Sequence, residues 1–134
     1  MTAEATASFP AASDPLGRVR FALSVDLPEV SSDFDLNPQV VLPEGRRLRE
    51  AAVLIPLLHR PAGLEVILTK RSSHLAHHPG QIAFPGGKID PGDADAPSAA
   101  LREAEEEIGL PPASVAILGH LPVHETVTGY RVHP

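Results

Sequence analysis

Apolar and polar positions along the chain predict strands at the start of its compact part, near Glu50. Residues 51–58 form a continuous apolar run of strand length, which favours a strand buried on both faces. Pro56 lacks an N–H, so we expect an edge or a bulge there. Residues 60–63 have turn chemistry and precede a second strand at 64–70, so the two strands are predicted to form a β-hairpin.

Further strands are predicted downstream on either side of one helix. Residues 81–84 are short and strand-like and run into Pro85-Gly86-Gly87, which we expect to be a loop. Residues 88–95 are rich in Asp, Gly and Pro and are predicted to be a loop as well. Residues 115–121 and 130–133 are predicted as the remaining strands.

The predicted helix runs from about Pro97 to Ile108. Pro97 suits the first helical turn, and Gly109 followed by two prolines ends the helix. Leu101, Ala104 and Ile108 share one face of this helix, which we expect to pack against the sheet.

The first third of the chain is less regular. Residues 1–14 show no periodicity and are predicted to be disordered. Asp14-Pro15 favours the start of a helix, whereas residues 18–27 alternate with the period of a strand, and both readings stay open. Residues 28–48 are rich in Pro, Asp and Ser, so we expect 15–48 to be an N-terminal arm or linker.

Composition narrows the possible functions. The 134 residues carry a formal net charge of −6, which argues against a nucleic-acid or membrane partner bound through bulk positive charge. There is no cysteine, so disulfides, zinc-thiolate sites and thiol nucleophiles are excluded. The longest apolar run, 51–58, is far shorter than the roughly 20 residues that span a bilayer. Residues 1–14 contain no Lys or Arg, unlike a signal peptide, and we expect a cytoplasmic protein.

The predicted helix carries the candidate chemistry. Glu103, Glu106 and Glu107 lie together at spacings i, i+3 and i+4, opposite the apolar face. Alone, such a face is usually just solvated, and like charges at i, i+4 cost roughly 0.2–0.5 kcal/mol per pair. A divalent cation such as Mg²⁺ would turn this repulsion into coordination. Gly86-Gly87, 16 residues before Glu103, lets a backbone carbonyl approach a ligand, and the combination favours a metal site.

These residues resemble a known sequence motif. Gly87, Asp93 and residues 102–110 are similar to the Nudix box, G-x5-E-x7-R-E-U-x-E-E-x-G-U, where U is bulky or apolar. The second half matches at every defined position when Ala104 is taken as U. In the first half, Asp93 replaces the glutamate, and eight residues rather than seven separate it from Arg102. We expect this shorter acid, on its longer loop, still to reach the arginine that it braces in the family.

The flanks of the box resemble those of coenzyme A diphosphatases. Residues 68–72, Gly80 and residues 84–87 are similar to the signature of that subfamily, as are Asp90 and residues 127–130. The resemblance covers roughly residues 50–134. It implies an α/β (α+β) fold, a Nudix-type α/β/α sandwich around a mixed sheet. The domain would occupy 49–134 and be incomplete at its C-terminal side.

The resemblance also implies an activity. The family hydrolyses nucleoside diphosphates linked to another group, and the subfamily would cleave coenzyme A or its thioesters to 3′,5′-ADP and 4′-phosphopantetheine or its acyl derivative. The implied cofactor is Mg²⁺ or Mn²⁺. Its implied ligands are Glu103, Glu106 and Glu107, assisted by the Gly87 carbonyl. The implied catalytic residues are Glu103, the expected general base, and Glu106. The implied substrate-binding residues are Arg71, Gly86 and Gly87.

Other readings stay open. The chain departs from the subfamily signature at Ala76, where the signature has an arginine, although His77 and His78 stand nearby. These histidines and His74 are expected to be polar loop residues, and Tyr130 has either a structural role or an adenine to stack on. One alternative function is a Nudix hydrolase for another diphosphate, such as ADP-ribose or a dinucleotide. The other is an inactive, truncated Nudix-like chain that binds nucleotides or a partner, or that does not fold stably alone.

Overall fold

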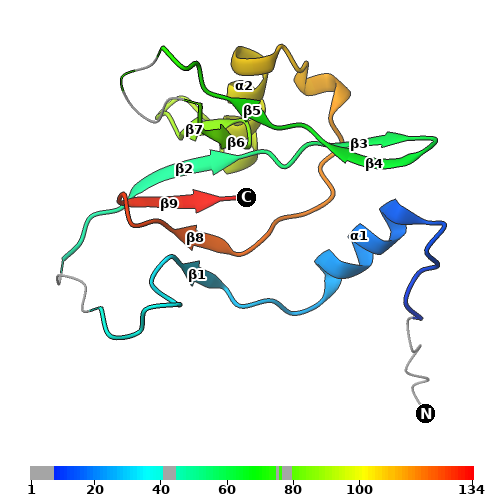
Figure 1. The fold of residues 1–134 in the computed structure, drawn as a ribbon, viewed down its shortest axis with the longest axis horizontal. Helices are drawn as coiled ribbons and strands as arrows, with labels where there is room; N and C mark the ends of the chain where they lie inside the picture. Colours follow the sequence, from blue (N-terminus) through cyan, green and yellow to red (C-terminus); the bar gives the residue numbers. More distant parts are fainter. Residues whose placement is uncertain (1–7, 41–44, 75, 77–79) are drawn as a thin grey trace.

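The computed structural model describes residues 8–40, 45–74, 76 and 80–134. Its elements follow one another along the chain as shown in Figure 1. They are α1 (Pro15–Ser24), β1 (Val30–Ser32), β2 (Arg49–Val53), β3 (Leu57–Arg60), β4 (Gly63–Val66), β5 (Thr69–Lys70), β6 (Ile82–Ala83), β7 (Gly86–Lys88), α2 (Ala96–Ile108), the 3₁₀ turn η1 (Pro112–Ser114), β8 (Val123–Glu125) and β9 (Tyr130–His133).

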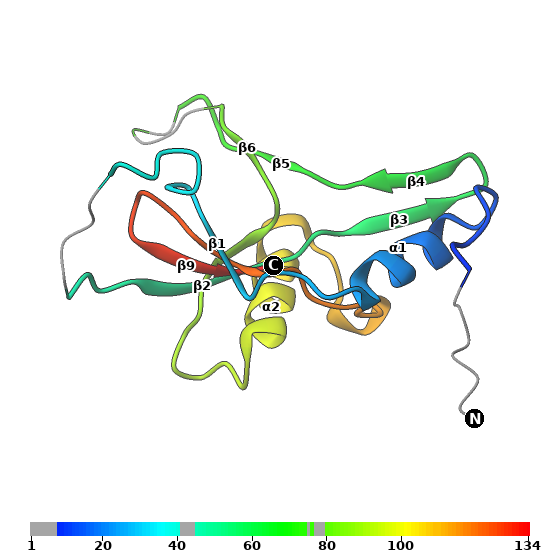
Figure 2. The same cartoon turned by 90° about the horizontal axis from the view of Figure 1, so that it is seen from below.

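The main sheet has five strands in the order β1-β8-β9-β2-β7. Strand β2 runs parallel to β9 and antiparallel to β7, and β1 runs parallel to β8, so the sheet is mixed as predicted. Strands β3 and β4 form a separate hairpin, and β5 pairs with β6 in a second small ribbon. Figure 2 shows α2 below the central strands and the β3–β4 hairpin extending away from them. The predicted mixed α/β fold is therefore confirmed.

Small side chains make the contact between α2 and the sheet. Ala52 of β2 and Ala99 and Ala100 of α2 are buried and form the core cluster. Because alanine is short, the helix axis lies close to the strands, and this closeness brings the polar side of α2 near β7. The predicted core face is corrected here: Ala104 is fully buried as expected, whereas Leu101 is only half-buried and faces a groove.

The ends of α2 follow from local sequence. The Asp95 side chain accepts a hydrogen bond of 2.8 Å from the Ser98 N–H, which satisfies a free donor of the first turn. At the other end Gly109 adopts a left-handed conformation, φ 67°, and its N–H donates to the carbonyl of Glu105. The predicted helix is confirmed to within one residue.

The N-terminal part of the chain joins the main sheet. Residues 15–24 are helical, because Asp14 caps the helix by accepting from the Gly17 N–H at 2.9 Å. Within the segment expected as an arm or linker, β1 pairs with β8 and so extends the sheet. Of residues 1–14, for which we predicted disorder, 1–7 lie outside the described residues.

Four predictions about strands and loops are corrected. The run 51–58 is divided into β2 and β3 by residues 54–56, which include Pro56, and the predicted strand 64–70 is divided into β4 and β5 by residues 67–68. Gly86-Gly87 lies in β7 rather than in a loop. Residues 115–121 are not a strand. They cross beside α1, where a Cβ on Gly119 would contact Leu23. The Leu121 N–H donates to the Pro134 carbonyl at 3.2 Å, but the segment forms no ladder with any strand that the structure describes. Val123–Glu125 pairs instead, as β8, and the predictions for the β3–β4 hairpin and for 130–133 are confirmed.

An apolar groove of about 470 Å³ lies between α1, α2 and residues 114–121. Its lining also includes residues 53–59 and 133–134. Among the helices that the structure describes, none is long and apolar enough to cross a membrane.

Candidate active site

Gly87 of β7 lies directly against Glu103 of α2. A Cβ built on Gly87 would lie 2.7 Å from the carboxyl carbon of Glu103 and within 3.0 Å of both its oxygens. Only glycine leaves that space free, and the Glu103 side chain fills it with just 19% of its surface exposed. The absence of a side chain on Gly87 therefore sets the position of the Glu103 carboxylate.

Arg102 ties α2 to the loop that precedes it. Its Nε and one Nη donate to the two oxygens of Asp93 at 2.9 and 3.0 Å, a bidentate pair. The same Nη lies 3.3 Å from a carboxylate oxygen of Asp90 and donates to the Lys88 carbonyl at 3.2 Å. The expectation that Asp93 reaches the arginine is confirmed. The contact with the Lys88 carbonyl had no signal in the sequence, because any residue type supplies a backbone oxygen.

The Asp93 carboxylate is held in its charged form. Hydrogen bonds from Arg102, and from the Asp90 N–H at 2.8 Å, lower the pKa of Asp93 below its ordinary value. In return, the hydrogen bond with Asp93 raises the pKa of Arg102 above its ordinary value. The loop between β7 and α2 is therefore fixed by a charged pair on the helix surface.

The remaining Nη of Arg102 points to two of the three predicted glutamates. It donates to Glu103 at 3.2 Å and to Glu106 at 3.4 Å. Glu106 is 60% exposed, so this second contact is a weak one in solvent. Arg102 thus orients Glu103 through one oxygen and reaches Glu106 one helical turn later.

The surroundings of Glu107 disfavour the charged form of its carboxyl group. Glu107 is exposed, but partial desolvation of its carboxyl raises its pKa, and the negative charges of Glu103 and Glu106 raise it further. A backbone hydrogen bond from Gly86 and the positive charge of Arg71 act in the opposite direction. Glu107 is therefore close enough to Glu103 and Arg71 for their charges to affect its proton affinity.

The residues present are compatible with a divalent cation. The three glutamates offer only oxygen donors, which Mg²⁺ and Mn²⁺ prefer, and Gly87 leaves open space for the carboxylate of Glu103. Among the described residues, no three His, Asp or Glu side chains form a group arranged to hold a metal ion, so at least one of the three glutamates would have to move for all three to bind one.

Arg71 is positioned by the β5–β6 ribbon. Its N–H donates to the Gln81 carbonyl at 2.8 Å and its carbonyl accepts from the Gly80 N–H at 3.1 Å. Its side chain is exposed, and its charge acts on Glu107. The ribbon therefore holds Arg71 near enough to α2 for its charge to lower the pKa of Glu107.

The other candidates lie apart from this group or outside the described residues. The guanidinium of Arg49 lies 5.3 Å from the centre of the Tyr130 ring, a contact that supports the structural reading of this tyrosine. The His74 N–H donates to the Ser72 hydroxyl at 3.2 Å, within the loop. His77 and His78 lie outside the described residues.

Comparison with known proteins identifies the family. A model of the NUDIX domain matches residues 48–134. A protein of Escherichia coli K12 called "Uncharacterized Nudix hydrolase NudL" is 50% identical over 112 residues, which are 83% of this chain and 57% of that protein. Homologues of the same name from Escherichia coli O1:K1 / APEC and Shigella boydii serotype 18 are 49% identical over the same lengths. The chain thus spans just over half the length of these curated relatives, and on the strength of the domain match it belongs to the Nudix family.

Proposed function

We propose that the chain is a divalent-metal-dependent pyrophosphohydrolase that cleaves the diphosphate of coenzyme A or its thioesters. The observation that carries this proposal is the Glu103 carboxylate, held over Gly87 and oriented by Arg102. The Arg102–Asp93 pair supports it, because it makes this orientation rigid. The coenzyme A assignment rests on the similarity of residues 68–72 and 84–87 to the subfamily signature.

The residues on the side of α2 that carries Glu103, Glu106 and Glu107, and those that face it, have distinct roles in this proposal. Glu103, Glu106 and Glu107 hold the ion, and Glu103 takes the proton from the attacking water as general base. A bound Mg²⁺ or Mn²⁺ supplies neutralisation of the diphosphate charge and a water of lowered pKa. Arg71 binds phosphate oxygens, since its planar fork suits bidentate contact. The backbone at Gly86 and Gly87 lets the substrate approach closely.

The direct test is Mg²⁺-dependent release of 3′,5′-ADP from coenzyme A by the full chain. Glu107→Gln should reduce this release by orders of magnitude. Glu105→Gln is the matched control, because Glu105 is an exposed glutamate of the same helix outside the acidic trio. Equal loss in both variants, or full turnover in Glu107→Gln, would contradict the assignment of the site.

Two alternatives are separated by the same protein preparation. A panel of ADP-ribose and dinucleotides identifies a Nudix hydrolase with a different diphosphate substrate. A second alternative is a chain that binds its ligand without turnover. A rise in melting temperature with Mg²⁺ and coenzyme A, without product, would support binding alone, since a ligand bound only by the folded state stabilises it.

A further inference from the structure

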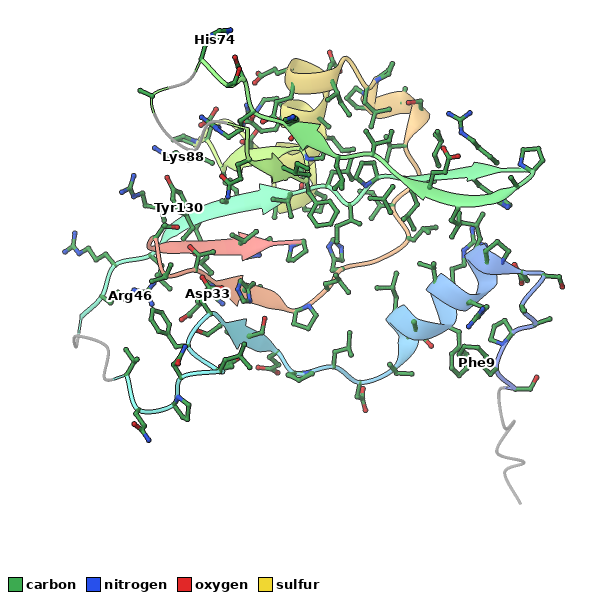
Figure 3. All side chains as sticks on the ribbon, viewed as in Figure 1. Phe9, Asp33, Arg46, His74, Lys88 and Tyr130 are labelled. Carbon is green, nitrogen blue, oxygen red and sulfur yellow. The ribbon has the colours of Figure 1, made fainter. Side chains whose placement is uncertain are left out.

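A serine, a histidine and an aspartate form a hydrogen-bonded chain on the edge of the sheet opposite β7. The Ser31 hydroxyl lies 2.8 Å from His124 Nδ1, and His124 Nε2 lies 2.8 Å from a carboxylate oxygen of Asp33. Ser31 belongs to β1 and pairs with His124 of β8 in the parallel register. Figure 3 shows Asp33 just beyond β1, on the side of β8. Three residues from two distant parts of the sequence thus meet in one line.

The carboxylate of Asp33 is firmly placed. Its second oxygen accepts from the Val127 N–H at 2.8 Å, and its own N–H donates to the Glu125 carbonyl at 3.0 Å. The hydrogen bond with His124, followed by that from Val127, lowers the pKa of Asp33 below its ordinary value. At neutral pH Asp33 is therefore ionised and accepts hydrogen bonds only.

This determines which nitrogen of neutral His124 carries the proton. Because Asp33 accepts only, the proton lies on Nε2 and is donated to Asp33. Nδ1 then has a free lone pair, and its hydrogen-bond partner among the described residues is the hydroxyl of Ser31, which donates to it. The polarity of this chain is that of a nucleophile, its general base and the group that orients the base.

The group is accessible and separate from the acidic side of α2. The side chains of His124 and Asp33 are 36% and 41% exposed, and Ser31 is half-buried. In the sheet, β8, β9 and β2 lie between β1 and β7, the strand that carries Gly87. A small electrophile in solution can reach this group without entering the diphosphate site.

We propose that Ser31 is a nucleophile that accepts acyl groups from activated carboxylic esters. The Ser31 oxygen forms a bond to the carbonyl carbon as its proton passes to His124 Nδ1. The bond from that carbon to the leaving oxygen then breaks, and the leaving group takes the proton from His124, so that acyl-Ser31 and an alcohol or phenol result. Asp33 is a positioning residue, since it acts on the reaction through His124.

The test uses p-nitrophenyl acetate with the full chain at neutral pH. We expect release of p-nitrophenolate and an acetyl group on Ser31, located by peptide mass mapping. Ser31→Ala should remove that acetylation, whereas Ser32→Ala, at the adjacent serine of β1, should keep it. His124→Gln should slow acetylation of Ser31 by about a hundredfold, in the range of general-base effects. Asp33→Asn, which keeps the shape of the side chain, should also slow it.

The rate against pH supplies a further readout. Acetylation of Ser31 should rise with the loss of one proton in the wild-type chain, and this dependence should disappear in His124→Gln. Circular dichroism melts show whether each variant is folded. If His124→Gln is unfolded, the rate of Ser31 acetylation in Asp33→Asn decides the test. Equal acetylation of Ser31 and Ser32, or an unchanged rate in a folded Asp33→Asn variant, would overturn the proposal. Metal-dependent coenzyme A hydrolysis is expected to stay unchanged in Ser31→Ala, so this proposal and the proposed function fail independently.

Discussion

Replacing Gly87 with alanine tests the close approach of β7 to the Glu103 carboxylate. The added Cβ would lie 2.7 Å from the carboxyl carbon of Glu103, whereas ordinary contacts begin at 3.4 Å, so this carboxylate must move by about 0.7 Å. The atoms in the way belong to the end of a flexible side chain, which can rotate. Gly87 does not have a positive φ, so alanine fits the backbone. The fold should therefore tolerate the change, and the free energy of unfolding should change by less than about 1 kcal/mol.

Activity should respond much more strongly than stability. A catalytic group displaced by about 1 Å can cost as much as a hundredfold in rate, so we expect a 10- to 100-fold loss of metal-dependent hydrolysis. Affinity for Mn²⁺, measured by electron paramagnetic resonance of the free ion, should fall as well, because Glu103 is a proposed ligand. Gly92→Ala is the control, since it adds the same methyl group in the β7–α2 loop, where nothing lies within 4 Å.

The outcome decides whether the position of the Glu103 carboxylate over β7 contributes to the chemistry. If Gly87→Ala keeps both its turnover and its Mn²⁺ affinity, the position of Glu103 over β7 has no part in the chemistry, and the reasoning from that contact is refuted. If Gly92→Ala loses as much activity as Gly87→Ala, the loss results from disturbing the segment that leads into α2 and not from displacing the Glu103 carboxylate.

Three further predictions concern neighbouring positions. Gly86→Ala should destabilise the fold by about 1–3 kcal/mol in urea denaturation, because its Cβ would meet backbone atoms, among them Val53 Cα at 2.7 Å. Glu107→Gln should raise the melting temperature of the metal-free chain at pH 7. The raised pKa of Glu107 means that the folded state disfavours the charged carboxylate at this pH, and glutamine removes that charge. A lower melting temperature would contradict this. Asp93→Asn should lower the free energy of unfolding at pH 7. This difference from wild type should disappear as the pH falls below 3.8 and through the lowered pKa of Asp93, because protonation removes the stabilising effect of its charge. Urea denaturation at pH 7 and at a pH below 3.8 checks this.

Predictions from the sequence succeeded where local chemistry decides the structure. The limits of α2 follow from the Asp95 cap, the proline in its first turn and Gly109, and all three act within a few residues of the helix. The helical state of residues 15–24 has the same origin in Asp14, which competed with a strand-like alternation nearby. The pairing of Asp93 with Arg102 followed from a motif whose spacing brings the two together.

Predictions failed where the structure depends on distant partners. Residues 115–121 have the composition of a strand but form no ladder with any described strand, whereas the polar segment Val123–Glu125 pairs with β1 on one side and β9 on the other. Gly86 and Gly87 are expected in a loop, yet they pair with β2 in β7, where a Cβ on Gly86 would meet Ala52 and Val53 and a Cβ on Gly87 would meet Glu103. The group around His124 had no local signal, since its members come from segments 93 residues apart.

The position of β9 has a consequence for how the chain folds. This strand lies between β2 and β8 in the sheet, and its register pairs Arg49 with Tyr130, while β1 pairs Val30 with Val123. Contacts between such distant residues close long loops before any energy is gained, which makes folding slow. During synthesis, β1 emerges from the ribosome long before β8, and β2 emerges long before β9, although its other neighbour β7 follows sooner. Until residues 123–133 follow, β1 has no partner and one edge of β2 is unpaired, and exposed strand edges of this kind favour aggregation of a nascent chain.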